Sequence, residues 1–490
     1  MVAFAQDVVY VSSSGSNEEP YDSEINAATT LGTAVAYANA QGIRTVQVLG
    51  TVDLTAKTSL ANVEVCGDGW ESSVLNLKAD LNPGLDIGAN ASVHGIKFTA
   101  SGVSNPRSIF SLTADSSMVS NCWITGMNTK TSYADTEIAG HAKAGLITHC
   151  LFTNNHSNNG GGGSGNGVGM LGLEGTAIMR NSIFTGNYTS GNVRGPCDGV
   201  LGIRGSATLE NCVIYGNYTQ ASSGGDKDSG GSKLRRGGGI IVYSGSPVIR
   251  NCIIRNNRYP NDYMEIPGGV DIYKPLREGD FLIITGATPL IENCNVPEGQ
   301  VPAGAVGCQT DDPKFTDPDV ATLANRDFTI ADDSPCVDAG KAQEWQMTAT
   351  DYSGINDRYQ GLGVDIGAFE YDWKNDYGKA LAMKNLIVTD VSANGVVETD
   401  GVIRMTDGGE LGAILSGTEK ATYVMRATLA GTGTLVVKLN GAEVGRLTTD
   451  GSVTFEADEN PADLRYAYMG EGKATLSLLF RKTGMILMVR

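Results

Sequence analysis

The stretch NCVIYGN, from Asn211 to Asn217, decides the fold of this chain because the sequence repeats it almost unchanged. Six related copies begin elsewhere along the chain, at Gly95, Asn121, His149, Asn181, Asn251 and Asn293. The second residues of the seven copies follow one another at intervals of 26, 28, 32, 30, 40 and 42 residues. Periods of this length are typical of stacked repeats, in which each unit buries its apolar face only against its neighbours.

The residues inside each copy indicate a short strand between two corners. Apolar and polar residues alternate, which is strand periodicity, and the Asn before the strand and the Gly or Asn after it tolerate left-handed backbone. Another short strand precedes each copy, as in GVLGIRG from Gly199 and GIIVYSG from Gly239. We therefore predict an all-β fold, a right-handed parallel β-helix in the form of a single-stranded solenoid, with rungs about 4.8 Å apart.

Equivalent residues of successive copies are expected to stack in columns. We expect each Asn at the first corner to hydrogen-bond to the Asn of the next rung. The position after it holds small or slim groups that suit a narrow core: Ile96, Cys122, Cys150, Ser182, Cys212, Cys252 and Cys294. Five of the nine cysteines lie in this column, so we predict buried free thiols that act as small apolar groups. Three cysteines outside the column are candidate disulfide partners: Cys197, Cys308 and Cys336.

The residue before the corner forms a charged column, which comprises Arg180, Glu210, Arg250 and Glu292. Alternating charge on successive rungs places opposite charges side by side. We predict an exposed stacking ladder with no catalytic role. Since exposed ion pairs contribute only about 0.2–1 kcal/mol each, Glu210→Ala is expected to cost little stability.

Composition and charge restrict the partners and the location of the protein. The formal net charge of the 490 residues is −18, which argues against nucleic acid and against anionic membrane surfaces as partners. No apolar run is long enough to predict a transmembrane segment. The small-residue pattern Ala3-Phe4-Ala5 predicts that residues 1–6 are the remnant of a signal peptide, and hence a secreted or cell-surface protein, extracellular or periplasmic.

The N-terminal region predicts a cap for the solenoid. Residues 7–65 read as a cap with the first turns, including a short helix in which Leu31, Val35 and Ala38 share one face. Residues 66–310 hold the repeats. Together these two regions resemble the right-handed parallel β-helix proteins of the pectate-lyase-like superfamily.

Residues 311–378 resemble the choice-of-anchor Q segment, which closes many exported bacterial β-helices. The matching pieces are DDPKFTDPD from Asp311, NRDFTIADDSPCVDAG from Asn325, DYSGINDR from Asp351 and GVDIGAFEYDW from Gly363. These resemblances imply the fold and export of the protein. They imply no particular chemistry, because the superfamily includes lyases, hydrolases, epimerases and non-catalytic adhesins.

The remaining residues, 379–490, predict a separate antiparallel β-sandwich. Alternating runs such as TLVVKL flank NGAE from Asn440, a hairpin-turn sequence. The region resembles carbohydrate-binding jelly-roll modules, although it has no Trp for a sugar platform. Its tyrosines are Tyr423, Tyr466 and Tyr468. A spacer or docking domain is the alternative interpretation.

Candidate site residues come from the insertions that follow the repeated strand, since insertions at one corner of a solenoid project from one side. Lys233 and Arg235 are candidate catalytic bases for β-elimination. Asp226 and Asp228 are candidate Ca²⁺ ligands, although two carboxylates alone make an incomplete site. The candidate substrate-binding residues, among which Arg offers a planar fork to carboxylates or sulfates, are Arg194, Asp198, Arg236, Arg258 and Tyr263. Plain solvated loops are the competing interpretation.

These features predict a protein that interacts with a polysaccharide or a cell-surface glycan. A polysaccharide lyase is the predicted enzyme, and the alternative is a non-catalytic glycan-binding or cell-adhesion protein. The Gly-His-Gly element and clustered Asp residues of polygalacturonan hydrolases are not recognisable, because GHAK around His141 differs from that element.

Overall fold

The computed structural model describes most of the chain in two compact units. The described residues are 7–103, 106–128, 137–158, 170–191, 200–221, 238–260, 276–278, 281–283, 286–331, 333–358, 364–371, 386–391, 395–397, 403–405, 409–415, 421–449, 451–457, 462–469, 472–482 and 485–489. The first unit comprises Met1–Ile330, Ala339–Arg358 and Asp365–Glu370, and the second comprises the remainder. The predicted signal-peptide remnant, residues 1–6, lies outside the described residues.

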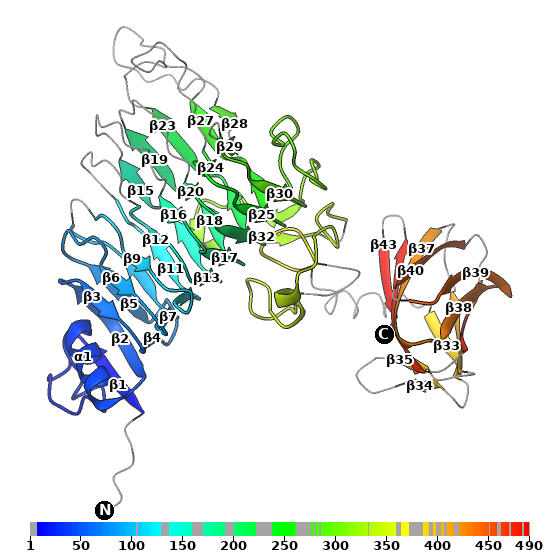
Figure 1. The fold of residues 1–490 in the computed structure, drawn as a ribbon, viewed down its shortest axis with the longest axis horizontal. Coiled ribbons are helices and arrows are strands. Elements are labelled where there is room, and N and C mark those ends of the chain that lie inside the picture. The colour runs from blue at the N-terminus through cyan, green and yellow to red at the C-terminus, as the bar shows by residue number, and fades with distance from the viewer. Residues whose placement is uncertain are drawn as a thin grey trace, which may run out of the picture. The chain divides into compact units, whose positions relative to one another are not determined.

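The first unit is a stack of parallel sheets, as predicted (Figure 1). Sheet A holds the strand before each Asn corner: β1 (Val8–Ser12), β2 (Thr45–Leu54), β4 (Glu64–Gly67), β7 (Ser92–His94), β10 (Met118–Ser120), β13 (Leu146–Thr148), β17 (Ile178–Arg180), β21 (Thr208–Glu210), β25 (Val248–Arg250) and β30 (Leu290–Glu292). Sheet B holds the end of β2 and the strand after the corner: β5 (Ser73–Leu77), β8 (Lys97–Thr99), β11 (Trp123–Thr125), β14 (Leu151–Thr153), β18 (Ile183–Thr185), β22 (Val213–Tyr215) and β26 (Ile253–Arg255).

Two further sheets complete the rungs. Sheet C holds the strand that precedes each copy: β3 (Thr58–Leu60), β6 (Leu85–Ile87), β9 (Phe110–Leu112), β12 (Gly140–Ala142), β16 (Leu171–Leu173), β20 (Leu201–Ile203), β24 (Ile240–Val242) and β29 (Phe281–Ile283). Sheet D holds β15 (His156–Asn158), β19 (Tyr188–Gly191), β23 (Tyr218–Ala221), β27 (Arg258–Pro260) and the antiparallel β28 (Leu276–Glu278). The stacked parallel sheets establish a β-helix-like fold, whereas its right-handed coil stays a prediction.

The predicted N-terminal helix is α1 (Leu31–Gln41), which the hydroxyl of Thr30 caps by accepting from the backbone of Thr33. Leu31, Val35 and Ala38 share its buried face, as predicted, and join the solenoid core. Figure 1 shows α1 beside β1 and β2 at the first rungs. The helix therefore covers apolar surface that no preceding rung covers.

Both corners of the repeat adopt the backbone that the sequence predicts. The residue before the thiol column has a φ of 43–54° at Asn121, His149, Asn181, Asn211, Asn251 and Asn293. The rung-to-rung hydrogen bonds expected among these Asn side chains are largely missing. Asn181 and Asn293 instead donate to the backbone carbonyls of Thr350 and Ala339. The expectation was wrong because a later segment of the chain packs against this corner and satisfies the amides.

An Asn ladder does exist, but at the other corner. Asn155, Asn187, Asn217 and Asn257 are fully buried, and the side-chain amide of each of the first three donates to the side-chain carbonyl of the next at 2.9–3.0 Å. Each amide also donates to a backbone carbonyl of the preceding rung, as Asn187 does to Phe152. The ladder therefore ties four successive rungs together through satisfied buried hydrogen bonds.

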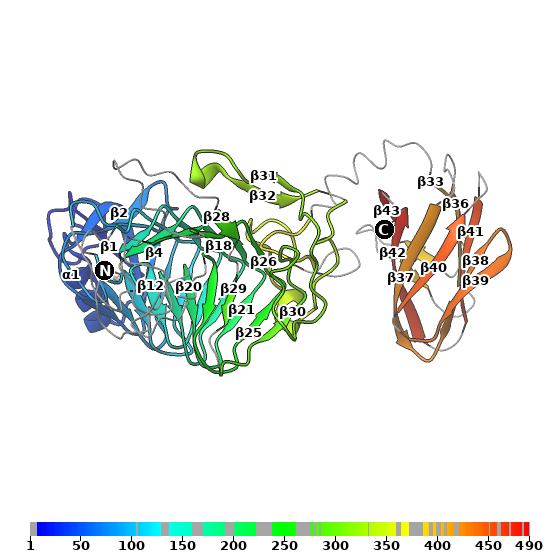
Figure 2. The same ribbon diagram turned by 90° about the horizontal axis from the view of Figure 1, so that it is seen from above.

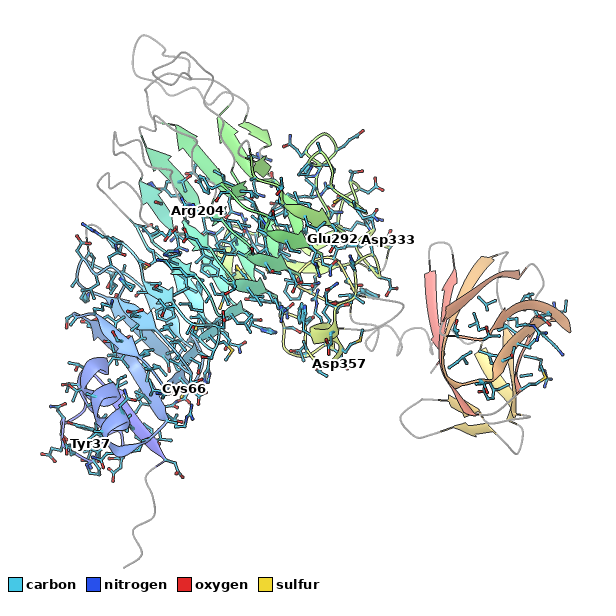
Figure 3. The ribbon with its side chains drawn as sticks, viewed as in Figure 1. Tyr37, Cys66, Arg204, Glu292, Asp333 and Asp357 are labelled. Atoms are coloured by element: carbon cyan, nitrogen blue, oxygen red, sulfur yellow. The ribbon has the colours of Figure 1, made fainter. Side chains whose placement is uncertain are left out.

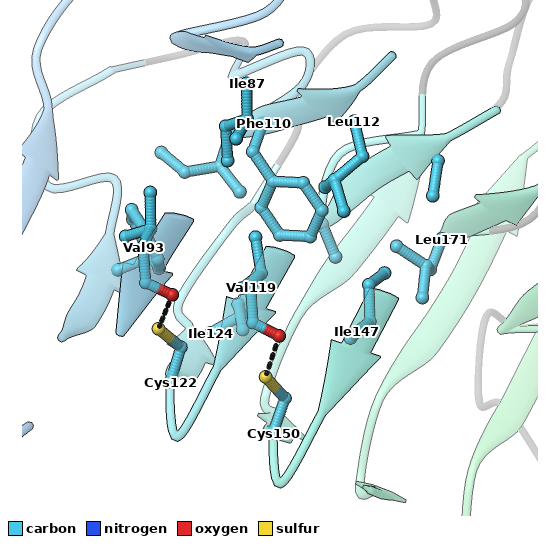
Figure 4. Packing of buried hydrophobic residues seen from close by; sticks show 14 of the residues in the cluster. Ile87, Val93, Phe110, Leu112, Val119, Cys122, Ile124, Ile147, Cys150 and Leu171 are labelled. Atoms are coloured by element: carbon cyan, nitrogen blue, oxygen red, sulfur yellow. Dashed lines mark hydrogen bonds between the residues drawn. The ribbon is translucent and has the colours of Figure 1, made fainter. Parts of the chain in front are cut away.

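The thiol column lies in the core, as predicted (Figure 4). Cys122 and Cys150 donate to the carbonyls of Ser120 and Thr148, and Ser182 makes the same hydrogen bond to Arg180. Burial raises the pKa of the Cys122, Cys252 and Cys294 thiols well above its usual value, which keeps them protonated. Serine and cysteine interchange here because both are slim groups that donate to the same carbonyl.

Two of the candidate disulfide partners form no disulfide among the described residues, so that part of the cysteine prediction is corrected. These two are Cys308 and Cys336, and Cys197 lies outside the described residues. Cys308 follows Gly307, whose φ is 66°, and Gln309 bridges Asn295 of the preceding rung. Cys308 thus continues the thiol column by one rung, with Gly at the corner, as in the copy that begins at Gly95.

The charged column forms ion pairs, but it is buried rather than exposed. Glu210 accepts from Arg180 at 2.9 Å and lies 3.4 Å from Arg250, which also contacts Glu292 at 3.1 Å. The Glu210 side chain is only 4% exposed. Three residues between 341 and 345 cover the column. Lys341 forms an ion pair with Glu292, Gln343 accepts a hydrogen bond from Arg250, and Trp345 stacks against the guanidinium of Arg180. The prediction of an exposed ladder was therefore wrong.

Residues 311–330, 339–358 and 365–370 run along the outside of the solenoid (Figure 2). The hairpin of β31 (Phe315–Asp317) and β32 (Asp327–Ile330) lies over sheet B (Figure 2), where Tyr215 packs against Phe315 and Phe328. The DYSGINDR and GVDIGAFEYDW pieces meet in a buried network. Arg358 contacts Glu370 at 3.2 Å, and Glu370 accepts from the backbone of Asp365. These motif residues are therefore structural, while their membership of a choice-of-anchor segment stays a prediction.

The second unit contains two antiparallel sheets. One holds β33 (Leu386–Val391), β36 (Gly409–Leu415), β41 (Ala462–Met469), β38 (Thr434–Leu439) and β39 (Ala442–Leu447). The other holds β34 (Gly395–Val397), β35 (Ile403–Met405), β42 (Gly472–Lys482), β37 (Ala421–Gly431) and β40 (Gly451–Ala457), with β43 (Met485–Val489) beside β42. Asn440 and Gly441 form the predicted turn with positive φ. Tyr468 is fully buried and cannot serve as a sugar platform. A sandwich and a carbohydrate-binding role stay predictions.

Candidate functional site

Most residues predicted for the site fall outside the described residues. These are the candidate bases Lys233 and Arg235, the candidate Ca²⁺ ligands Asp226 and Asp228, and the candidate binding residues Arg194, Asp198, Arg236 and Tyr263. Arg258 is the one member of the predicted set that the described ranges include. It lies at the start of β27, where it is exposed and pairs in register with Tyr218.

Arg258 continues a column of aromatic side chains on sheet D. The register places His156 beside Tyr188, Tyr188 beside Tyr218, and Tyr218 beside Arg258. The His156 and Tyr188 rings stack with centroids 3.7 Å apart, and the Tyr188 and Tyr218 rings stack at 4.9 Å with an angle of 5°. We call these four residues the aromatic column. Burial lowers the pKa of His156 to about 4, so its ring is neutral near pH 7.

The aromatic column differs from the aromatic stack inside the solenoid. Phe152 and Phe184 also stack, at 4.2 Å, but both are fully buried and fill the core. In the column, Tyr218 is 36% exposed, and His156 and Tyr188 are half-buried. Core packing explains the Phe pair, whereas it leaves the exposed edges of the tyrosines unexplained.

The sequence contains a signal for the aromatic column just beyond each seven-residue repeat. The four residues each lie six positions after the thiol column, counted from Cys150, Ser182, Cys212 and Cys252. The Asn ladder lies five positions after it. An alignment of the repeats beyond the heptad would therefore have found both columns.

A second polar cluster lies on the outer face of sheet C. His141 points outward between the buried Gly140 and Ala142 of β12. Its Nδ1 lies 3.1 Å from Glu137 and its Nε2 lies 3.3 Å from Glu174. Arg204 donates to Glu174 at 2.8 Å and stacks on Tyr243, with 4.9 Å between guanidinium and ring centre. Figure 3 labels Arg204 at the middle of the solenoid.

Glycine makes room for this cluster. Gly172 and Gly202 occupy the rungs after His141 in the same column of sheet C. A Cβ on Gly172 would lie 2.3 Å from Oε1 of Glu137, so a larger residue there would displace that carboxylate. The two glycines, with Glu137, Glu174, Arg204 and Tyr243, line a recess that has no room for a water molecule.

The electrostatics of the cluster favour a neutral imidazole beside an ionised Glu174. Burial lowers the pKa of His141, and the negative charge of Glu174 opposes that effect only in part. Burial also opposes ionisation of Glu174, yet the hydrogen bond from Arg204 and the neighbouring His141 hold its pKa below the usual value. One ligand atom each from Glu137, His141 and Glu174 lie within 4.8 Å of one another, so these residues are candidate metal ligands.

Another recess lies between sheet B and the 311–319 segment. Its lining includes Tyr215, Arg255, Lys314 and Asp319, and its volume is about 330 Å³. The guanidinium of Arg255 already donates to Asn295 and to the carbonyl of Asp311. We interpret this recess as a seam where the segment packs on the solenoid.

Comparisons with known proteins give no family. No family model matches the chain, and no curated protein matches it. A tailspike protein of Acinetobacter baumannii bacteriophage Fri1, described as a capsular polysaccharide depolymerase, is 10% identical, with a TM-score of 0.24 and coverage of 99% of this chain and 88% of that chain. The enzymatically active domain of tailspike protein 4 of bacteriophage CBA120 is 10% identical, with a TM-score of 0.17. The match covers 92% of this chain and 66% of that chain. Similarity at this level carries no conclusion about function.

No described helix is both long and apolar enough to cross a membrane.

Proposed function

We propose that this protein is an exported or cell-surface β-helix protein that binds polysaccharide along sheet D. The observation that supports the proposal is the aromatic column, in which one aromatic ring per rung leads to the exposed Arg258. The partner is an extended glycan, because the binding groups repeat along the direction in which the rungs stack.

The geometry of the column determines how it would contact a sugar. Both faces of the Tyr188 ring are covered, by His156 and by Tyr218, so sugar rings cannot stack on them. The rings instead offer their edges and the hydroxyl groups of the tyrosines, which both donate and accept hydrogen bonds. Because the stacked rings are held in place before binding, little side-chain entropy is lost on contact.

Arg258 supplies the charge preference of the surface. A guanidinium binds carboxylates and sulfates through paired hydrogen bonds. The protein as a whole carries a formal charge of −18, so any attraction for an acidic polymer is local and weakens with added salt. We therefore expect a uronate- or sulfate-containing glycan to bind better than a neutral one at low ionic strength.

A polysaccharide lyase is the second candidate function. The Glu137–His141–Glu174–Arg204 cluster favours it, because it places acid–base groups and a guanidinium together in a recess of sheet C. The predicted bases Lys233 and Arg235 remain part of this hypothesis. β-Elimination needs a base and a positive group that neutralises the uronate carboxylate.

Affinity electrophoresis of the purified protein in gels that contain uronic-acid or neutral polysaccharides, with and without Ca²⁺, tests the proposal. We expect retardation in at least one uronic-acid gel and at least a tenfold loss of affinity in the Tyr188→Ala/Tyr218→Ala double variant. Tyr37→Ala is the matched control, because Tyr37 lies on α1 and packs against the ring of Tyr21. Unchanged binding by a folded double variant would show that the glycan does not contact sheet D.

Ultraviolet absorbance of the same mixtures separates the two functions. Unsaturated products that disappear in Lys233→Ala or Arg235→Ala would establish a lyase. Binding without products would establish the non-catalytic alternative. Calcium dependence of binding, lost in Asp226→Asn/Asp228→Asn, would confirm the predicted Ca²⁺ ligands.

A further inference from the structure

The Glu137–His141–Glu174 cluster lies on sheet C, outside the aromatic column that carries the proposed binding function. We propose that these three side chains bind one divalent transition-metal cation of the Zn²⁺ class. The three residues come from two successive rungs, since Glu137 precedes β12, His141 lies within it and Glu174 follows β16. Stacking of the rungs therefore brings the ligands together.

The hydrogen-bonding capacity of the imidazole is the first support. Each ring nitrogen faces a carboxylate oxygen, at 3.1 Å and 3.3 Å, but a neutral imidazole carries a single N–H group. If Nδ1 donates to Glu137, Nε2 directs a lone pair towards the Glu174 carboxylate. Nε2 is buried and makes no hydrogen bond within the described structure. A cation between Nε2 and Glu174 replaces this repulsive contact with two coordinate bonds.

The surroundings of the ligands are the second support. Arg204 donates to Oε1 of Glu174 at 2.8 Å and leaves Oε2 directed at the imidazole. Carboxylates that ligate metals are commonly held by such outer hydrogen bonds. The Glu174 carboxylate is thereby oriented before any ion binds.

The donor set selects the class of cation. Imidazole nitrogen suits Zn²⁺ and similar ions, whereas Ca²⁺ prefers six to eight oxygen ligands. The ligand atoms lie within 4.8 Å of one another. Small side-chain movements therefore place each of them at about 2.0–2.2 Å from a shared ion, which is the zinc–ligand distance. Three protein ligands leave a coordination position for water or for an oxygen of a bound molecule.

Isothermal titration of the metal-free protein with ZnCl₂, and separately with CaCl₂, tests the site. The wild-type protein is expected to bind one more Zn²⁺ per chain than His141→Ala or Glu174→Gln. Its Ca²⁺ binding is expected to equal that of the two variants. Loss of a direct ligand is expected to lower the affinity of this site at least about 100-fold. Cobalt substitution gives a second readout, since its visible absorption reports a bound imidazole and should vanish in His141→Ala.

His94→Ala is the matched control. His94 contacts Glu64 at 2.6 Å on sheet A, so it is a His–Glu pair outside the described cluster of potential ligands. Its Zn²⁺ stoichiometry should equal that of the wild type. Equal stoichiometry and affinity in wild type, His141→Ala and Glu174→Gln would overturn the proposal. If a variant does not fold, as judged by circular dichroism, His141→Gln keeps a hydrogen-bond donor between the carboxylates and still removes the imidazole ligand.

Discussion

The charged column of sheet A and the aromatic column of sheet D follow the same rule of one side chain per rung, but their surroundings differ. Residues 341–345 cover the charged column and leave Glu210 only 4% exposed. The aromatic column ends in an exposed Arg258, and its Tyr218 is 36% exposed. The comparison teaches that the repeat creates columns, whereas the chain packed over a column decides whether it stabilises the fold or faces a partner.

Glu210→Ala should have the largest effect on stability. The substitution leaves Arg180 and Arg250 partly buried without their shared carboxylate, and removal of one partner of a buried ion pair costs about 3–5 kcal/mol. Urea unfolding measures the loss. Lys57→Ala, which breaks the exposed pair with Asp86, is the control and should cost at most about 1 kcal/mol. Similar small losses in both variants would mean that the cover over sheet A contributes little.

Asn187→Ala should have an intermediate effect. Its amide links Asn155 to Asn217 and also donates to Phe152, so the substitution leaves buried groups unsatisfied at a cost of about 1–3 kcal/mol. Thermal or urea unfolding checks the value. Asn26→Ala removes an exposed hydrogen bond to Asp22 and should change stability by less than about 0.5 kcal/mol. A neutral result for Asn187→Ala would show that water replaces the ladder.

Acidification should have the smallest effect. The pKa of His156 is lowered to about 4 by burial, below the value of about 6.5 in an unfolded chain. Between these values the unfolded state binds more protons, so this contribution to stability is present above pH 6.5 and is lost as the pH falls towards 4. Solvent screening of a half-exposed ring keeps this contribution to the free energy of unfolding below about 1 kcal/mol. The melting temperature of His156→Gln should fall less than that of the wild type between pH 7 and pH 4.5; an identical fall would exclude the effect.

The sequence predicts the features that one repeat can encode. Strands, corners and the thiol column recur in each copy, and Asn211–Asn217 contains all three. The exposure of the charged column could not be predicted because its cover comes from Lys341 and Trp345, far along the chain. The metal-ligand cluster was missed because Glu137, His141 and Glu174 do not recur from rung to rung, and only the stacking of β12 on β16 brings them together.

The Asn ladder has a consequence for how the solenoid can change length. The hydrogen bond between neighbouring rungs is the same at each step of the ladder Asn155, Asn187, Asn217 and Asn257. The surface that a rung offers to the next rung is therefore equivalent to the surface on which it packs itself. Duplication or deletion of one whole rung would restore the ladder at the junction. A change of a few residues within a strand would break it. The fold therefore permits evolution to lengthen or shorten the molecule in whole steps, each of which adds or removes one unit of the proposed glycan-binding surface.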